Sequence, residues 1–191
     1  ELCSLQQVDA TKVVAIGFCF GGLCVLDLAR SGASVAGVVS FHGLLNPPAE
    51  GVTPKPISSK VLVLHGYDDP MVQPEMVVDF CSEMTHANAD WQIQMYGHTK
   101  HAFTNPQAND PSLGTVFDEN ANRRAFAAMD YFLQEVFIDN KTKDAIIWKH
   151  QVYRYQNLLD RMDFWQKELL RLEIGSGSIV SLEGDFSPET I

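Results

Sequence analysis

The feature that most constrains the fold is an alternation of short apolar runs with amphipathic stretches. Continuous apolar runs of this length are typical of strands buried on both faces of a parallel sheet, whereas a 3.6-residue apolar spacing indicates helices. The alternation predicts a β-α-β-α-β order, and hence an α/β fold with a mostly parallel sheet flanked by helices. The expected strands are residues 12–16, 35–41, 61–65 and 91–96, and the expected helices are residues 21–30, 74–84 and 119–137.

Such a topology also predicts where the chemistry lies. In open α/β sheets the active residues occupy the loops beyond the carboxyl ends of the strands. Those loops follow residues 16, 41, 65 and 96, and the last of them, residues 98–114, is long and polar. Candidate catalytic side chains are therefore sought in these four segments.

Composition and charge exclude several classes of partner. Apolar residues make up 46% of the chain and charged residues 20%, as in ordinary globular proteins. The net charge of −10 repels nucleic acid and anionic membrane surfaces, so we expect neither as a partner. No apolar run reaches the length of a membrane span, no signal peptide is visible, and the four cysteines show no paired spacing. These features predict a cytoplasmic protein.

A cysteine between glycines follows the first expected strand. The run Gly17–Gly22 places Cys19 in a tight strand-turn-helix, where glycines remove Cβ atoms that would collide with neighbouring backbone. The turn exposes the sulfur, and the positive end of the following helix favours negative charge on it. This is the nucleophile position of an α/β-hydrolase-type turn. A buried structural cysteine beside a helix-packing glycine is the alternative.

An acid candidate follows the third expected strand. Asp68 and Asp69 are adjacent, and a carboxylate in this loop can orient a histidine and stabilise its positive charge. We favour Asp69 as the acid and assign Asp68 to turn formation. Because Asp-Asp-Pro is also good turn chemistry, a purely structural turn is the alternative.

The base candidate is His101, in the loop after the last expected strand. His98 and His101 could instead form a metal pair, but their spacing without a third ligand motif is weak support, so we expect no metal. The order Cys19, Asp69, His101 is the nucleophile, acid, histidine order of α/β-hydrolases, and each residue follows an expected strand.

Together these motifs resemble the dienelactone hydrolase family, which includes the carboxymethylenebutenolidases and uses a cysteine nucleophile in this turn. The resemblance covers residues 13–137, and the family pattern also puts the acid at Asp69. The motifs that carry it are Gly17–Gly22, Ser40-Phe41-His42-Gly43, His65-Gly66 with Asp69 and Val72, His101-Ala102-Phe103-Thr104-Asn105-Pro106, and Phe117-Asp118-Glu119 with Arg123-Arg124.

The resemblance implies acyl transfer on small esters or lactones without a cofactor. Cys19 would attack the carbonyl, His101 would move protons, and Asp69 would orient His101. The backbone N–H of Phe20 would contribute to the oxyanion hole. A second oxyanion donor and the first strands come, in the family, from a segment upstream of the turn that has no counterpart here. We therefore expect residues 1–138 to form an N-terminally incomplete hydrolase domain.

The C-terminal region lies outside the resemblance. Its apolar residues recur at three- and four-residue steps, which predicts one amphipathic helix within residues 139–174, from about residue 142 to 172. A flexible acidic tail is expected at residues 175–191. The helix either packs as another core helix or mediates homo-oligomerisation. An interaction module built on a catalytically silent hydrolase remnant is thus the alternative function.

Overall fold

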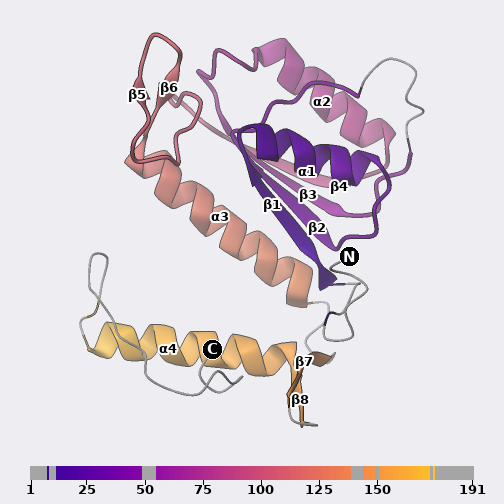
Figure 1. The fold of residues 1–191 in the computed structure, drawn as a ribbon, viewed down its shortest axis with the longest axis vertical. Helices are drawn as coiled ribbons and strands as arrows, with labels where there is room; N and C mark the ends of the chain where they lie inside the picture. The colour runs from indigo at the N-terminus through magenta and orange to yellow at the C-terminus, as the bar shows by residue number, and fades with distance from the viewer. Residues whose placement is uncertain are drawn as a thin grey trace.

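A four-stranded parallel sheet forms the centre of the molecule (Figure 1). The computed structural model describes residues 8, 12–48, 55–138, 144–148, 151–172 and 174. The strands lie in the order β1-β2-β3-β4, each parallel to the next and paired without a register shift. They are β1 (Val14–Phe18), β2 (Gly37–Phe41), β3 (Lys60–Gly66) and β4 (Asp90–Tyr96). The predicted α/β fold is confirmed.

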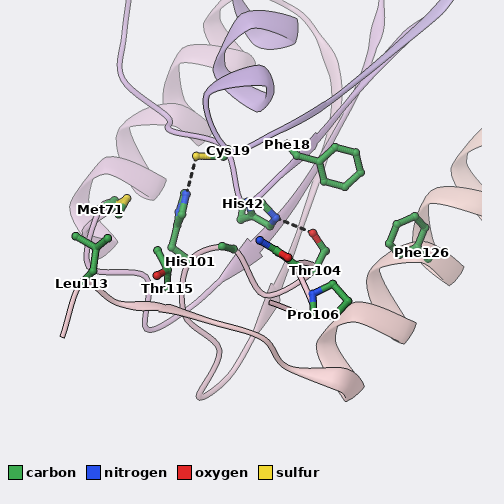
Figure 2. Close-up of a pocket in the computed structure, with 12 residues that line it drawn as sticks. Phe18, Cys19, His42, Met71, His101, Thr104, Pro106, Leu113, Thr115 and Phe126 are labelled. Atoms are coloured by element: carbon green, nitrogen blue, oxygen red, sulfur yellow. Dashed lines mark hydrogen bonds between the residues drawn. The ribbon is translucent and has the colours of Figure 1, made fainter. Parts of the chain in front are cut away.

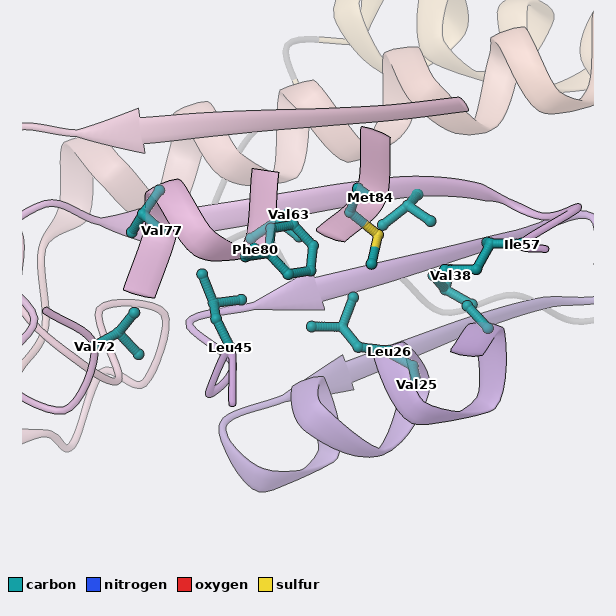
Figure 3. Packing of buried hydrophobic residues seen from close by; sticks show 12 residues of the cluster. Val25, Leu26, Val38, Leu45, Ile57, Val63, Val72, Val77, Phe80 and Met84 are labelled. Carbon is teal, nitrogen blue, oxygen red and sulfur yellow. The ribbon is translucent and has the colours of Figure 1, made fainter. Parts of the chain in front are cut away.

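Three helices cover the two faces of this sheet. Helices α1 (Phe20–Arg30) and α2 (Pro74–His86) lie on one face, and α3 (Glu119–Ile138) lies on the other (Figure 1). Alternate residues of the central strands therefore enter two separate apolar cores. In β2, Val38 packs toward α1 and α2, and Val39 packs toward α3. Figure 3 shows the first core, where Leu26 of α1 and Phe80 of α2 meet over the sheet.

An ion pair joins the ends of the two helices on the first face. Arg30, the last residue of α1, is almost fully buried, and its guanidinium donates two hydrogen bonds of 2.8 Å to Glu83 of α2. A third bond, of 2.9 Å, reaches Asp27 one turn earlier in α1. Two parallel bonds fix the relative orientation of donor and acceptor, so this pair holds the C-terminal ends of α1 and α2 together.

The segment between β4 and α3 contains more regular structure than the predicted loop. Strands β5 (Asn109–Asp110) and β6 (Thr115–Val116) pair antiparallel within it. His101 forms an isolated bridge to Thr115. Its N–H donates to the carbonyl of Gly114 and its own carbonyl accepts from the N–H of Val116, each at 3.0 Å. The backbone of the base candidate is thus fixed on both sides.

The C-terminal region corrects one prediction. A β-hairpin, β7 (Asp144–Trp148) and β8 (Gln151–Arg154), occupies the first part of the predicted helix, and α4 runs only from Tyr155 to Arg171. The prediction of one helix from residue 142 was wrong because β-branched and aromatic residues cluster in this segment and pair across two strands, as Ile147 does with Val152.

Helix α4 contacts the hairpin and lies apart from the sheet in Figure 1. Large apolar side chains on it are exposed to solvent, among them Met162, Phe164 and Leu170. Self-association through this helix stays a prediction. The expected acidic tail, residues 175–191, lies outside the described residues. Among the residues that the structure describes, no helix combines the length and apolarity needed to cross a membrane.

The turn between β1 and α1 depends on glycines at fixed positions. A Cβ atom on Gly17 would overlap the carbonyl of Gly21. One on Gly22 would lie 2.6 Å from the Ser40 hydroxyl and 2.7 Å from the Cα of Gly43. These close approaches allow α1 to start directly at the end of β1. Gly21 differs, because nothing lies within 4 Å of a Cβ built there.

This contrast gives a matched test of the turn. We expect Gly17→Ala to lower the free energy of unfolding by about 3 kcal/mol, because the added methyl must displace backbone. Gly21→Ala should leave stability unchanged or raise it by up to about 1 kcal/mol, since alanine favours the helix and meets open space. Urea unfolding of both variants measures the difference. Equal losses in the two variants would contradict this account of the turn.

Candidate active site

Cys19 occupies the connection between β1 and α1. Its backbone is left-handed, with φ 54° and ψ −119°, a conformation that non-glycine residues rarely adopt. The turn is held by its N–H, which donates to the carbonyl of Phe41 at 3.0 Å, and by its carbonyl, which accepts from Gly22 at 2.9 Å. Cys19 is exposed. The sheet and helix therefore hold a strained turn that presents the thiol to solvent.

The imidazole of His101 lies against this thiol. Its Nε2 is 3.0 Å from the Sγ of Cys19, although 82 residues separate the two in sequence. His101 is 1% exposed, so the ring is almost fully enclosed. A thiol and an imidazole at hydrogen-bonding distance can exchange a proton.

Asp69 completes a chain of three groups. Its Oδ2 is 2.7 Å from the Nδ1 of His101, and its Oδ1 accepts the N–H of Met71 at 2.9 Å. Asp69 is 3% exposed, whereas its neighbour Asp68 is exposed and lies 3.7 Å from the Nδ1 of His98. The structure thus brings Cys19, Asp69 and His101 together and leaves Asp68 outside, at the turn.

The environment of His101 favours its protonated form. Burial alone would lower its pKa, but the hydrogen bonds with Asp69 and Cys19, together with the charges of these two groups, outweigh burial and raise the pKa above its ordinary value of 6.5. A histidine that holds its proton near neutral pH, beside a sulfur, is suited to pair with a thiolate and to deliver a proton to a leaving group.

A glycine allows the His101 loop to approach the sheet. A Cβ atom on Gly66, the last residue of β3, would lie 2.5 Å from the carbonyl oxygen of Thr99 and 2.7 Å from that of Lys100. The loop after β4 can therefore pack directly on the end of β3. This packing brings Asp69, three residues beyond β3, within hydrogen-bonding distance of His101.

Phe20 is the first residue of α1 and follows Cys19 directly. Its side chain is 67% exposed. Because Phe20 begins the helix, its N–H has no helical acceptor, and no other acceptor for it lies among the described residues. A free N–H at the positive end of a helix, one residue from the sulfur, can stabilise an oxyanion.

An open cleft of about 730 Å³ surrounds the thiol. Figure 2 shows Phe18 and Phe126 on one side of it and Met71 and Leu113 on the other, with Cys19 between them. The lining is mostly apolar. The described residues that line it are Phe18, Cys19, His42, Met71, His101, Ala102, Thr104, Asn105, Pro106, Leu113, Thr115 and Phe126.

Sequence reasoning assigned no role to His42, although it quoted the motif that contains it. His42 follows β2 directly, is 3% exposed, and lines the cleft. Its Nε2 is 2.8 Å from the Thr104 hydroxyl, and burial followed by the charge of His101 lowers its pKa to about 4. The available signal was position, since His42 follows its strand as the other site residues follow theirs.

His98 and His101, the alternative metal pair, lie in different surroundings. His98 faces Asp68 at the surface, whereas His101 faces Asp69 and Cys19. Within the described ranges, no group of three or more His, Cys, Asp or Glu side chains could hold a metal ion.

The low pKa of His42 predicts sensitivity to acid. Between about pH 6.5 and 4 the unfolded chain binds a proton at this residue and the folded chain does not, so stability falls as pH falls. At pH 5 this amounts to about 2 kcal/mol relative to pH 7. Urea unfolding at several pH values measures the slope. In His42→Phe the slope should decrease by up to one proton, and parallel profiles for both proteins would contradict the assignment.

Comparison with known proteins gives this geometry a family context. The family model of the dienelactone hydrolase family matches residues 1–137. An uncharacterised Caenorhabditis elegans protein is 38% identical over 139 residues, covering 71% of this chain and 87% of that protein. A Saccharolobus solfataricus protein named as a candidate carboxymethylenebutenolidase is 27% identical over 136 residues, covering 71% of this chain and 48% of that protein.

Solved structures agree with the sequence match. A dienelactone hydrolase-like promiscuous phosphotriesterase from metagenomic libraries has a TM-score of 0.65 and 41% identity, covering 71% of this chain and 56% of that one. An α/β-hydrolase enzyme from a deep-sea metagenome, at 18% identity and a TM-score of 0.53 over 69% of this chain and 57% of its own, shares the fold. The chain thus spans little more than half the length of these structures. It belongs to the dienelactone hydrolase family.

Proposed function

We propose that the protein is a cysteine-dependent carboxylic ester hydrolase that cleaves small ester or lactone bonds. The proposal rests above all on the line Cys19 Sγ, His101 Nε2, His101 Nδ1, Asp69 Oδ2, whose two hydrogen-bonding distances are 3.0 and 2.7 Å. Membership of a hydrolase family supports the same reading. Cys19 is the nucleophile, His101 the general base and acid, and Asp69 the group that orients His101.

The reaction follows from these positions. His101 takes the proton of the Cys19 thiol, and the thiolate attacks the carbonyl carbon, forming a C–S bond as the C=O π bond opens. The negative charge on the carbonyl oxygen is stabilised by the Phe20 N–H at the start of α1. Collapse of this intermediate breaks the C–O bond, and His101 gives its proton to the leaving alkoxide. Water then attacks the thioester while His101 accepts a proton from it. Collapse of this second intermediate breaks the C–S bond and releases the carboxylic acid, which leaves the Cys19 thiolate beside the protonated His101.

The cleft supports the choice of small, uncharged acyl groups as first substrates. Its walls are formed mainly by aromatic and aliphatic side chains, and the rings of Phe18 and Phe126 lie 6.4 Å apart between centroids. Apolar walls favour apolar groups because both lose contact with water on binding.

Phosphotriesters are a second candidate class. The metagenomic relative that is 41% identical over 71% of this chain is named as a promiscuous phosphotriesterase. A phosphotriester is uncharged and presents an electrophilic centre to the same sulfur. Diethyl p-nitrophenyl phosphate, which shares its leaving group with p-nitrophenyl esters, tests this candidate directly.

Turnover of p-nitrophenyl acetate tests the proposal. We expect Cys19→Ala to reduce turnover to the background rate, because no other group replaces the sulfur. Asp69→Asn should lower it by about 10² to 10⁴, since the amide no longer stabilises the charged ring. Cys24→Ala is the matched control, because Cys24 is another exposed cysteine, within α1, and lies outside the cleft lining.

Two results would refute this function. One is turnover that survives in Cys19→Ala, and the other is equal loss in Cys19→Ala and Cys24→Ala. Alkylation with iodoacetamide followed by peptide mass spectrometry gives an independent readout, in which Cys19 should react faster than Cys24. The alternative of a catalytically silent interaction module predicts no turnover in any of these proteins.

A further inference from the structure

His42 is fixed by the sheet at the centre of the site. It directly follows β2, the strand between the one that leads to Cys19 and the one that leads to Asp69. Its N–H donates to the carbonyl of Leu64 at 2.8 Å, and its φ of 37° lies in the left-handed region. Because the backbone is paired to β3 in this strained conformation, the direction of the imidazole is set by the sheet.

The imidazole of His42 contacts the segment that carries His101. Its Nε2 is 2.8 Å from the hydroxyl of Thr104 (Figure 2). Its ring meets the His101 ring edge-on, with 5.2 Å between centroids and 65° between planes. It meets Phe103 in the same manner, at 5.2 Å and 77°. One side chain thus contacts three of the four residues from His101 to Thr104.

An apolar ring would be the less costly occupant of this position. His42 is 3% exposed, and its Nδ1 has no hydrogen-bond partner among the described residues. Burying a polar nitrogen without a partner costs about 1 to 3 kcal/mol, and a phenyl ring would avoid that cost. The bond to Thr104 is what histidine provides here and phenylalanine does not.

Several ionisable groups surround the His42 ring. His101 contacts it, Cys19 lines the same cleft, Asp69 lies behind His101, and His65 is the residue before the end of β3. Burial first, and the charge of His101 second, lower the pKa of His42 to about 4. The ring is therefore neutral at neutral pH. It can contact His101 without placing a second positive charge beside the imidazolium.

We propose that His42 is a positioning residue, whose ring and bond to Thr104 hold the His101 segment so that Nε2 of His101 stays on the Cys19 sulfur. The effect of His42 on ester turnover rests on the proposed function, whereas its effect on the position of His101 does not. A hydrogen bond and two ring contacts restrict rotation of His101 better than packing alone, because the bond is directional.

Two substitutions remove the bond from opposite ends. His42→Phe keeps an aromatic ring and loses the bond, and Thr104→Val keeps the shape and loses the hydroxyl. In both variants we expect the pKa of His101, measured by NMR titration, to fall toward 6.5, because His101 is then held less firmly against Asp69 and Cys19. The ratio of Cys19 to Cys24 alkylation at pH 6 should fall by more than about twofold, because the imidazole then supports the reactive sulfur less well. Ester turnover should fall through kcat with KM nearly unchanged.

Matched controls separate positioning from packing. Thr104→Ser retains the hydroxyl. It should leave the pKa of His101 unchanged and keep the alkylation ratio within about twofold of the wild type. His86→Phe makes the same replacement on the exposed surface of α2 and should leave both unchanged. The double variant His42→Phe with Thr104→Val should be no worse than the more affected single variant, since both remove one bond.

The proposal is overturned if folded His42→Phe and folded Thr104→Val both leave the pKa of His101 unchanged and the alkylation ratio within twofold of the wild type. If His42→Phe does not fold, Thr104→Val alone decides. Neither readout requires turnover. If the wild type hydrolyses no ester but the two variants show these shifts, the proposed function is contradicted and the positioning role is supported. If the wild type hydrolyses esters through Cys19 but the variants show no shifts, the proposed function is supported and the positioning role is contradicted.

Discussion

The parallel, in-register pairing of the central strands is the constraint on which the candidate site depends. Because β1, β2 and β3 pair without a shift, their carboxyl ends lie side by side. Cys19 and His42 are the first residues beyond two of these ends, and Asp69 lies three residues beyond the third. Short connections leave little freedom, so groups far apart in sequence meet at one edge. Only His101 needs a longer loop, which the bridge to Thr115 holds.

The same edge concentrates backbone strain. Three non-glycine residues with left-handed backbones line the cleft, namely Cys19, His42 and Ala102, with φ angles of 54°, 37° and 56°. Each such conformation costs about 1 to 3 kcal/mol and persists only where the surroundings fix it. Here the sheet and the two buried cores supply that support. Conformational freedom that a flexible site would lose on binding substrate is therefore already lost on folding.

The sheet and the grouping of Cys19, Asp69 and His101 could be predicted from sequence, because buried strands and strand-end residues leave local patterns. Asp69 and Asp68 differ in environment only once the His101 loop is in place, so the local sequence favoured Asp69 but left a purely structural turn open, and the family pattern agreed with Asp69. His42 could not be given a role, since its partners lie in a loop that follows another strand. The hairpin was missed because its apolar spacing also fits a helix, whereas the chain here forms two adjacent strands that pair with each other. The roles of the site residues stay predictions.

The buried Arg30 ion pair couples the positions of α1 and α2, the two helices on one face of the sheet. It joins α1 and α2 at their C-terminal ends, whereas Cys19 and the Asp69 loop lie at their N-terminal ends. Both helices pack on the sheet, and the ion pair joins them at the ends away from Cys19, so independent movement of α1 and α2 is restricted. A tilt of either helix would strain the two Arg30–Glu83 hydrogen bonds, and this opposes changes in the distance between Cys19 and the Asp69 loop. Arg30 and Glu83, which lie outside the cleft lining, thereby help to keep that distance constant.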